Sequence, residues 1–178
     1  ATVTVTVDNP FDRVETGGGG SDFLFGRGGD DLILAGAGRD FLFASRGDDY
    51  VDGGRGNDLV SGGQGNDTLL GGGGDDTLDG GGGNDWVIGG GGVDWTLSTT
   101  LLTGAGSDVL FFVERAEFTG DDEANRIDAS GFDGNVTIYG GGGDDTLLGG
   151  SGVDLLNGNG GDDSLVAGDG DDRIFGGA

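Results

Sequence analysis

The sequence predicts an all-β fold, a right-handed parallel β-roll or β-helix solenoid with two nonapeptides, and therefore 18 residues, in each coil. Three observations predict it: nonapeptides recur in one frame, each begins with a glycine-rich turn, and each places an apolar residue two positions after an Asp. Each nonapeptide supplies one turn and one short strand, and strands of successive coils stack about 4.8 Å apart. Such coils bury their apolar side chains only against neighbouring coils.

The regular repeats occupy two blocks. Nine contiguous nonapeptides extend from Gly17 to Leu97, and four more extend from Gly140 to Phe175. We number the positions within a repeat one to nine, so that the turn occupies positions one to four, Asp position six and the aliphatic residue position eight. Thr96 takes position eight in the ninth repeat and marks the end of the first regular array. The side chains expected to point inward are Leu24, Ile33, Leu42, Val51, Val60, Leu69, Leu78, Val87, Leu147, Leu156, Leu165 and Ile174.

The composition excludes several kinds of chemistry. The 178 residues include 47 Gly, one Pro, and 29 Asp against four Glu, which indicates short carboxylates at fixed places. His, Cys, Lys and Met are absent, so the chain has no Cys/His metal site, thiol nucleophile, imidazole base or Schiff-base lysine. A net charge of −25 disfavours nucleic acid and anionic membrane surfaces as partners. The chain begins at Ala1 without a signal-peptide pattern, and we expect it to be part of a longer protein.

The turns have the chemistry of a calcium site. Glycine permits positive φ and close backbone approach, so carbonyl oxygens can converge, and Asp supplies the negative charge. Calcium takes six to eight hard oxygen ligands at about 2.3–2.6 Å, more than one turn can provide. In an 18-residue coil each turn lies beside the turn two repeats later. The sequence therefore predicts ions held between stacked turns.

The repeats, of which GGQGNDTLL (Gly62 to Leu70) and GGGGDDTLD (Gly71 to Asp79) are examples, resemble the RTX (repeats-in-toxin) family of secreted, hemolysin-type calcium-binding nonapeptides. The resemblance covers about two-thirds of the chain. It implies carboxylate ligands at position six: Asp22, Asp31, Asp40, Asp49, Asp58, Asp67, Asp76, Asp85, Asp94, Asp145, Asp154, Asp163 and Asp172. It implies carbonyl ligands from the turns: Gly53, Gly54, Arg55, Gly56, Gly62, Gly63, Gln64, Gly65, Gly71, Gly73, Gly80, Gly82, Gly140, Gly142, Gly149, Ser151, Gly158 and Gly160. Pairing each turn with the second turn after it gives seven sites in the first block and two in the last, a ceiling of about nine Ca²⁺ ions.

The pattern divides the chain into four expected segments. Residues 1–16 form an N-terminal strand or cap, 17–97 a regular calcium roll, 98–139 an irregular, metal-poor β-helical stretch, and 140–178 a second calcium roll. Within the irregular stretch Asn125 and Val136 replace the Asp of position six. The turns at 35–40 and 44–49 lack the leading pair of glycines, and we expect their sites to be weak or empty.

The leading functional hypothesis is a non-catalytic, structural module of a secreted or cell-surface bacterial protein that is unfolded without calcium and folds when calcium binds. In the resembled family such behaviour accompanies type I secretion. The acids of the irregular stretch (Glu114, Glu117, Asp121, Asp122 and Glu123) lack the arrangement of a paired general acid and base, so we do not expect an enzyme.

Two other functions remain open on the sequence. One is surface binding, as an adhesin, a surface-layer module or an ice-binding roll. Ice binding is disfavoured because the position-seven series of one sheet, Phe23, Phe41, Leu59, Thr77 and Trp95, is not a rank of Thr or Asn. The other is an accessory domain of a secreted hydrolase or toxin. Outward-facing Phe23, Phe25, Phe41 and Phe43 predict contact with the N-terminal segment, a neighbouring domain or a second copy.

Overall fold

The computed structural model describes residues 3–4, 11–90, 95–98, 101–103 and 107–178. These residues form β-strands joined by turns, and no helix occurs among them. Accordingly, the described part of the chain has no helix suited to cross a membrane. The chain forms two compact units: unit 1 comprises Ala1–Val87 and Ala105–Val113, and unit 2 comprises Ile88–Gly104 and Glu114–Ala178.

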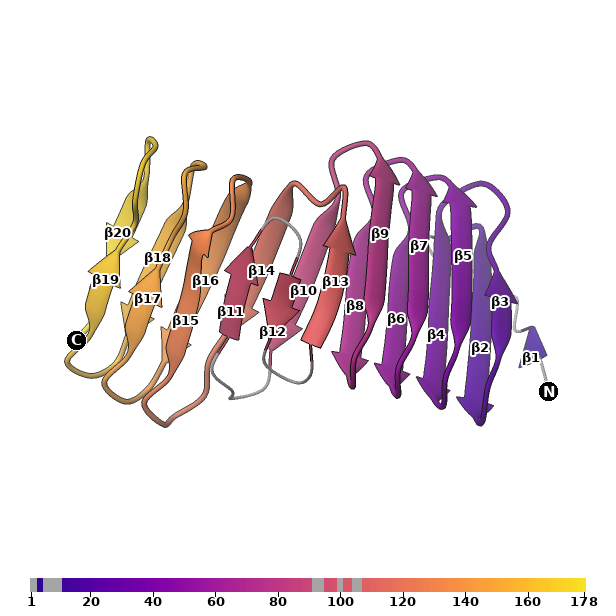
Figure 1. The fold of residues 1–178 in the computed structure, drawn as a ribbon, viewed down its shortest axis with the longest axis horizontal. Helices are drawn as coiled ribbons and strands as arrows, with labels where there is room; N and C mark the ends of the chain where they lie inside the picture. Colours follow the sequence, from indigo (N-terminus) through magenta and orange to yellow (C-terminus); the bar gives the residue numbers. More distant parts are fainter. Residues whose placement is uncertain (1–2, 5–10, 91–94, 99–100, 104–106) are drawn as a thin grey trace. The chain divides into compact units, whose positions relative to one another are not determined.

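Unit 1 is a stretch of parallel β-solenoid with two sheets, whose strands lie side by side in Figure 1. Successive strands alternate between the sheets, and each pairs in parallel with the strand one coil away. At the end of the first sheet, β1 runs antiparallel to β2. The first sheet contains β1 (Val3–Thr4), β2 (Arg13–Gly19), β4 (Asp31–Ala37), β6 (Tyr50–Arg55), β8 (Thr68–Gly73) and the start of β10 (Trp86–Gly90). The second contains β3 (Phe23–Phe25), β5 (Phe41–Arg46), β7 (Leu59–Gln64), β9 (Thr77–Gly82) and β13 (Ser107–Phe111).

The register in unit 1 confirms the predicted coil of two nonapeptides. Leu42 pairs with Val60, and Val60 pairs with Leu78, so each strand is offset by 18 residues from its neighbour. Position eight points inward in the repeats of unit 1, where Leu24 to Val87 at this position are at most 2% exposed. Positions six and one also face the interior, and Ala35 and Ala44 at position one are fully buried. The core therefore contains the repeat Asp residues as well as the aliphatic side chains.

The outward rows of Phe are confirmed at the start of unit 1. Phe23 stacks on Phe41 with ring centroids 4.6 Å apart, and Phe25 stacks on Phe43 at 5.4 Å. Phe23 is 61% exposed. The predicted position-seven series is wrong at its last member, because Val109 of β13 pairs with Thr77 where Trp95 was expected.

Unit 2 is a second stretch of solenoid with a less regular register. Ile138 pairs with Leu156 at the 18-residue offset, whereas Ala116 pairs with Val136 and Ile127 with Leu147 at an offset of 20 residues. One sheet contains β14 (Arg115–Thr119), β16 (Asn135–Gly141), β18 (Leu155–Asn159) and β20 (Arg173–Phe175). The other contains β12 (Leu101–Thr103), β11 (Trp95–Ser98), β15 (Arg126–Gly131), β17 (Thr146–Leu148) and β19 (Ser164–Val166).

Two expectations fail in unit 2. Strand β12 runs antiparallel to β11, so the all-parallel coil is interrupted there. Ile174, predicted to point into the core, is 51% exposed, and Leu165 is only partly buried. Both lie in β19 and β20, the last strand of each sheet in this unit, so no further described coil covers them. Position eight is nevertheless buried at Ile127, Ile138, Leu147 and Leu156, which keeps a continuous apolar core in the remaining coils.

Candidate metal centre

The Asp residues of position six are buried and joined to one another through the backbone. From Asp31 to Asp85, and again at Asp145 and Asp154, these residues are 0–3% exposed. Except at Asp31, the Oδ1 atom of each accepts a hydrogen bond from the backbone N–H at position six of the preceding coil, as from Asp40 to Asp58 at 2.8 Å and from Asp49 to Asp67 at 2.9 Å. The carboxylates therefore form rows along the solenoid, two in unit 1 and two in unit 2.

The second oxygen of most of these carboxylates has no protein donor. Within the described residues, buried Oδ2 atoms without a hydrogen-bond partner belong to Asp31, Asp40, Asp49, Asp58, Asp67, Asp145 and Asp163. Burying a carboxylate oxygen without a compensating partner is costly, so native proteins supply a donor, a proton or a cation. The regularity of these atoms along each row indicates a cation.

Glycine at position one keeps open the space that these oxygens face. A Cβ on Gly53 would lie 2.8 Å from Asp58 Oδ2 and 2.7 Å from the carbonyl oxygen of Gly71. Gly140 has the same two kinds of neighbour, Asp145 Oδ2 and the carbonyl oxygen of Gly158. A carboxylate oxygen of one coil and a carbonyl oxygen of the next thus converge on a gap that a side chain would fill.

The backbone of the regular turns is left-handed at positions two and four. In the turn before Asp58, Gly54 has φ 91° and Gly56 has φ 133°. A Cβ at either position would overlap a carbonyl oxygen of the preceding coil, from Gly36 and Gly38 respectively. At position two three turns hold residues other than glycine at positive φ: Arg27, Ser45 and Asn159. Such strain persists where the surrounding structure imposes it.

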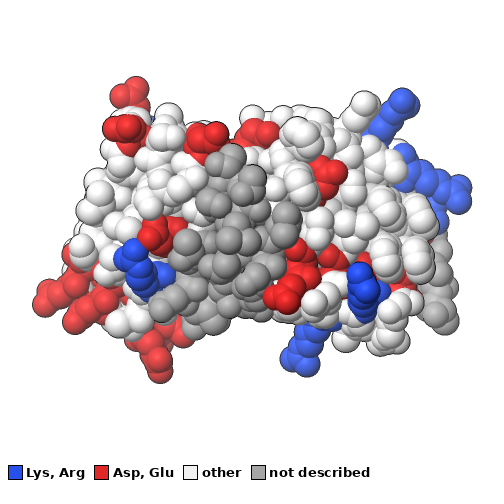
Figure 2. All heavy atoms as spheres, viewed as in Figure 1, with Lys and Arg blue, Asp and Glu red and all other residues white. Residues whose placement is uncertain are grey.

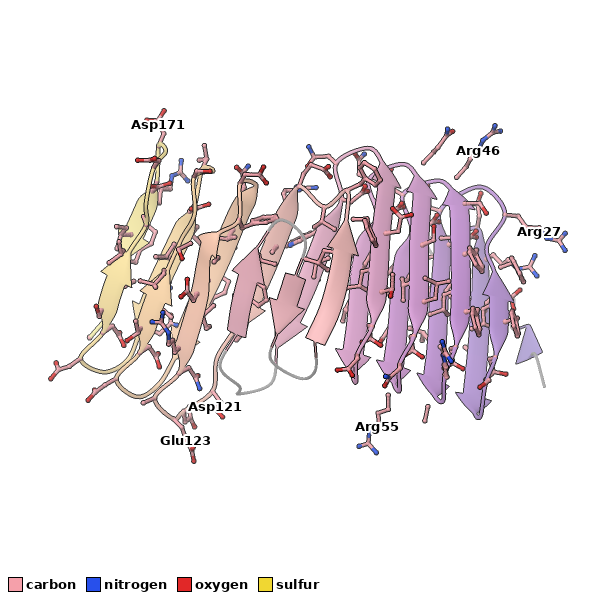
Figure 3. The ribbon with its side chains drawn as sticks, in the orientation of Figure 1. Arg27, Arg46, Arg55, Asp121, Glu123 and Asp171 are labelled. Carbon is pink, nitrogen blue, oxygen red and sulfur yellow. The ribbon has the colours of Figure 1, made fainter. Side chains whose placement is uncertain are left out.

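Long side chains at the turns leave this arrangement undisturbed because they point outward. Figure 3 shows Arg27, Arg46 and Arg55 extending away from the turns of unit 1. On the face of the molecule in Figure 2, charged side chains of both signs are separated by broad uncharged areas. Nine of the 29 Asp side chains are buried, all of them at position six, and the other Asp side chains that the structure describes are partly or fully exposed.

Burial changes the acidity of the rows. It raises the pKa of Asp49 and Asp58 to about 6 and that of Asp67 to about 7, with neighbouring carboxylates adding to the effect of burial. Burial also raises the pKa of Asp145 and Asp154 above the ordinary value. Near neutral pH the stacked carboxylates therefore favour a bound proton or cation.

The donor set fits calcium. Among the described residues no three carboxylates gather into one cluster, so an ion in these turns would take most of its ligands from backbone carbonyls. Six to eight ligands from flexible, mixed carbonyl and carboxylate sets suit Ca²⁺, whereas Mg²⁺ requires a smaller octahedral arrangement. The residues that would hold each ion are the position-six Asp and the turn carbonyls of two stacked turns.

The structure places the predicted carboxylates in four rows. Asp22, Asp40, Asp58 and Asp76 form one row of unit 1, and Asp31, Asp49, Asp67 and Asp85 form the other. In unit 2, Asp145 stands beside Asp163, and Asp154 beside Asp172. Asp94 lies outside the described residues.

Some of the predicted carbonyl ligands already have a structural role. The carbonyl oxygens at position three accept backbone N–H groups from position four of the preceding coil, as Gly73 does from Gly56 at 2.7 Å and Gly82 from Gly65 at 2.9 Å. Arg55 and Gln64 accept in the same way. A carbonyl oxygen has a second lone pair, so this bond leaves capacity for an ion.

Position five also joins the coils, which the sequence interpretation missed. Asp30 Oδ1 accepts the N–H of Asp48 at 2.9 Å, Asp48 Oδ1 that of Asn66 at 2.7 Å, and Asn66 Oδ1 that of Asn84 at 3.1 Å. The signal that could have identified these side chains is the recurrence of Asp or Asn at the 18-residue spacing.

The first half-coil begins earlier than the repeats suggested. Arg13 of β2 pairs with Asp31, so a guanidinium occupies position six one coil before Asp31. Glu15 takes the inward position eight, is 2% exposed and forms an ion pair with Arg13. Because the residues before Gly17 lack the glycine-rich turn, sequence alone did not indicate this coil.

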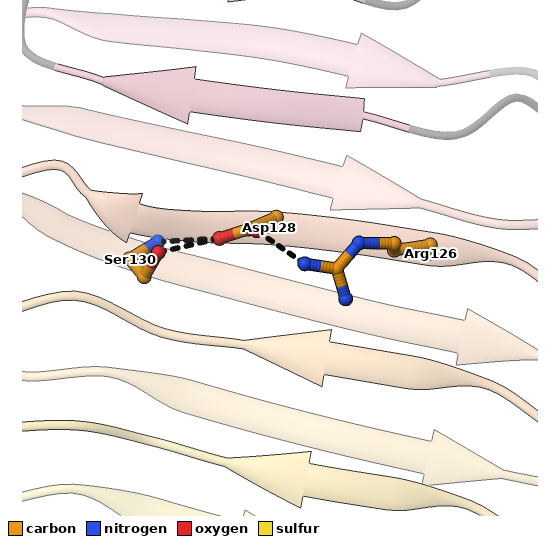
Figure 4. Close-up of polar contacts among 3 residues, drawn as sticks. All are labelled: Arg126, Asp128 and Ser130. Carbon is orange, nitrogen blue, oxygen red and sulfur yellow. Dashed lines mark hydrogen bonds and ion pairs between the residues drawn. The ribbon is translucent and has the colours of Figure 1, made fainter.

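Other acidic residues of unit 2 lie outside the rows. Asp121 and Glu123 lie on an exposed turn (Figure 3). On β15, Asp128 accepts the Ser130 hydroxyl at 2.6 Å and pairs with Arg126 at 2.5 Å (Figure 4). Although partial burial opposes it, the Ser130 hydrogen bonds and the Arg126 charge lower the pKa of Asp128. These three side chains join neighbouring positions of one strand at the surface of unit 2.

Fold and site together define a calcium-binding parallel β-solenoid. The family model of the RTX calcium-binding nonapeptide repeat matches residues 16–42, 25–60, 35–69, 61–95, 119–156 and 148–178. These ranges cover more than half of the chain, which therefore belongs to the RTX family of calcium-binding repeats. A search of curated protein sequences gave no match.

Proposed function

We propose that the chain is a non-catalytic module that folds when calcium binds, within a secreted or cell-surface bacterial protein. The observation that carries the proposal is the set of buried Asp Oδ2 atoms without protein donors, repeated in successive coils of both units. A cation between stacked turns would satisfy these atoms and join neighbouring coils.

The energetics favour an unfolded chain when calcium is absent. Each regular coil buries two aliphatic residues at position eight, but it orders many glycines, which lose more conformational freedom on folding than any other residue. It also places carboxylates of successive coils within a Debye length of one another. Because the native turns provide the ligand geometry, the binding free energy of the ions becomes folding free energy.

The calcium affinity expected of such sites indicates where the chain would fold. Extracellular calcium modules bind at about 10⁻⁴–10⁻³ M, so they fill where calcium is millimolar and remain empty in a cytosol. RTX repeats occur in secreted bacterial proteins, which supports an extracellular location. The chain would then be exported unfolded and fold outside the cell.

Far-UV circular dichroism of the purified chain at pH 7.5 tests the proposal. In excess EGTA we expect a spectrum of an unfolded chain, and millimolar CaCl₂ should produce a β-sheet spectrum. An equal concentration of MgCl₂, the control, should have little effect because Mg²⁺ does not fit a carbonyl-rich site of this size. A full β-sheet spectrum in EGTA would contradict calcium-induced folding.

A further inference from the structure

We propose that two repeat Asp residues, Asp22 and Asp154, hold no calcium although they match the motif, because their own turns satisfy their carboxylates. The proposal rests on the proposed function, in which the other regular turns bind calcium. By this inference Asp154 joins neighbouring parts of unit 2 through hydrogen bonds and without a metal ion, whereas Asp145 and Asp163 in the same unit hold a calcium ion.

The hydrogen bonds separate these residues from the others. Asp22 Oδ2 accepts the backbone N–H of Gly18 at 3.0 Å, and Asp154 Oδ2 accepts that of Gly150 at 2.8 Å. In both cases the donor is position two of the same turn. Asn125, which replaces Asp in unit 2, accepts the N–H of Asp121 in the same way at 2.8 Å.

The backbone at position two accounts for the difference. In each turn whose Asp Oδ2 is buried without a donor, position two has positive φ: Arg27 (100°), Gly36 (102°), Ser45 (93°), Gly54 (91°), Gly63 (117°), Gly141 (105°) and Asn159 (68°). Gly18, Gly150 and Asp121 are not among the residues with positive φ. The conformation of position two therefore decides whether its N–H reaches the carboxylate or leaves it to a cation.

A donated N–H makes a carboxylate oxygen a poorer ligand for a cation. Its hydrogen carries partial positive charge, repels a Ca²⁺ ion beside the same oxygen and takes up one of that oxygen's two lone pairs. Asp154 is satisfied on both sides, because its Oδ1 accepts the N–H of Val136 at 2.9 Å. Asp145, by contrast, has a donor for Oδ1, the N–H of Asn125, and none for Oδ2.

The surroundings of Asp154 hold its turn in this state. The preceding coil has Val136 at position six, and the Val136 N–H is the donor to Asp154 Oδ1. The carbonyl oxygen of Phe132 accepts the N–H of Ser151 at 3.2 Å, and the Phe132 side chain is 2% exposed. A Cβ on Gly150 would overlap that same carbonyl oxygen, so this stretch of backbone approaches the turn closely. Both oxygens of Asp154 therefore have protein donors, the N–H groups of Val136 and Gly150.

Calcium counting with a matched pair of variants tests the assignment. Asp154→Asn and Asp145→Asn both remove one buried carboxylate of unit 2 and keep an oxygen for the coil-to-coil hydrogen bond. We measure bound calcium per chain by equilibrium dialysis and elemental analysis in millimolar CaCl₂. Asp145→Asn should bind fewer ions than the unaltered chain, and Asp154→Asn the same number. Asp154→Asn should instead need more calcium to fold, because the amide group opposes the Gly150 N–H with a second donor.

A second pair keeps the test decisive if Asp154→Asn fails to fold. Asp22→Asn should leave the ion number unchanged, whereas Asp58→Asn, from the same row, should reduce it. Loss of ions in Asp154→Asn or Asp22→Asn as large as in the paired variant would overturn the inference. An unaltered chain that binds no calcium would instead contradict the proposed function, so the two failures are distinguishable.

Discussion

Two turns with the same motif differ in the hydrogen bonds that their Asp carboxylates accept. In unit 1, GGRGND (Gly53 to Asp58) has left-handed glycines at positions two and four, and Asp58 Oδ2 is buried without a donor. In unit 2, GGSGVD (Gly149 to Asp154) has neither glycine at positive φ, and Asp154 accepts donors on both oxygens. Strand β6 continues to Arg55 in the first case, whereas β17 ends at Leu148, before the turn.

The coils that precede these two turns also differ. The coil before the turn at 53–58 is another regular repeat, with Gly36 and Gly38 against Gly54 and Gly56. The coil before the turn at 149–154 carries Phe132 and Val136 in place of the usual glycine and Asp. The turn at 149–154 thus differs from the regular turns although it keeps their motif, whereas the turn at 140–145, which also follows an irregular coil, keeps Gly141 and Gly143 at positive φ.

The largest effect should come from adding a methyl group to a left-handed position of a regular turn. Gly56→Ala places a Cβ at φ 133° against the Gly38 carbonyl oxygen. A left-handed residue other than glycine costs about 1–3 kcal/mol, and the overlap adds to this because the opposing atom is backbone. We expect a large drop in the melting temperature of the calcium-loaded chain, followed by circular dichroism.

Gly73→Ala is the matched control, because it lies at position three of a regular turn with no atom within 4 Å of its Cβ and no positive φ. Its melting temperature should stay close to that of the unaltered chain. If Gly56→Ala and Gly73→Ala lowered the melting temperature equally, the left-handed backbone would not be the feature that sets the regular turns apart.

The contrast also shows how far the sequence alone could reach. The spacing of Leu42, Val60 and Leu78 was sufficient to predict the coil, its register and the inward side chains, because the apolar residues that recur in the sequence are the ones that the coil buries. The same spacing places Asp58 and Asp154 in equivalent positions. It contains no information about the φ of Gly54 and Gly150, since glycine allows both conformations. Whether each carboxylate oxygen has a hydrogen-bond donor could therefore be seen only in the three-dimensional structure of the turn and its neighbouring coil.

An intermediate effect should follow from pH in the absence of metal. The pKa of Asp67 rises from 3.8 to about 7 in the folded chain, and those of Asp49 and Asp58 to about 6. The folded chain therefore binds protons that the unfolded chain releases, so this contribution to stability is fully present below pH 3.8 and is lost as pH rises through about 6–7. In EGTA, the β-sheet signal in circular dichroism should increase as pH falls from 8 to about 5.

Asp67→Asn sharpens this prediction, because an amide is neutral at every pH in the series. In EGTA at pH 7.5 the variant should be more folded than the unaltered chain, and its dependence on pH should be weaker. Asp128→Asn is the control, since the pKa of Asp128 is lowered and its carboxylate lies on the outer face of unit 2. If the β-sheet signal in EGTA did not change between pH 8 and 5, the buried carboxylate rows would not be the cause of the pH dependence predicted for the metal-free chain.

The smallest effect should come from relieving strain at position two. Ser45 has φ 93° in the turn before Asp49, a conformation that glycine adopts without cost. Ser45→Gly should stabilise the calcium-loaded chain by about 1 kcal/mol, because relief of a left-handed residue exceeds the added entropy of the unfolded chain. Ser61→Gly, on strand β7 and without positive φ, should instead destabilise it by about 0.5–1 kcal/mol. Chemical denaturation in saturating calcium measures both, and a loss of stability in Ser45→Gly would mean that the left-handed turn is not strained at this position.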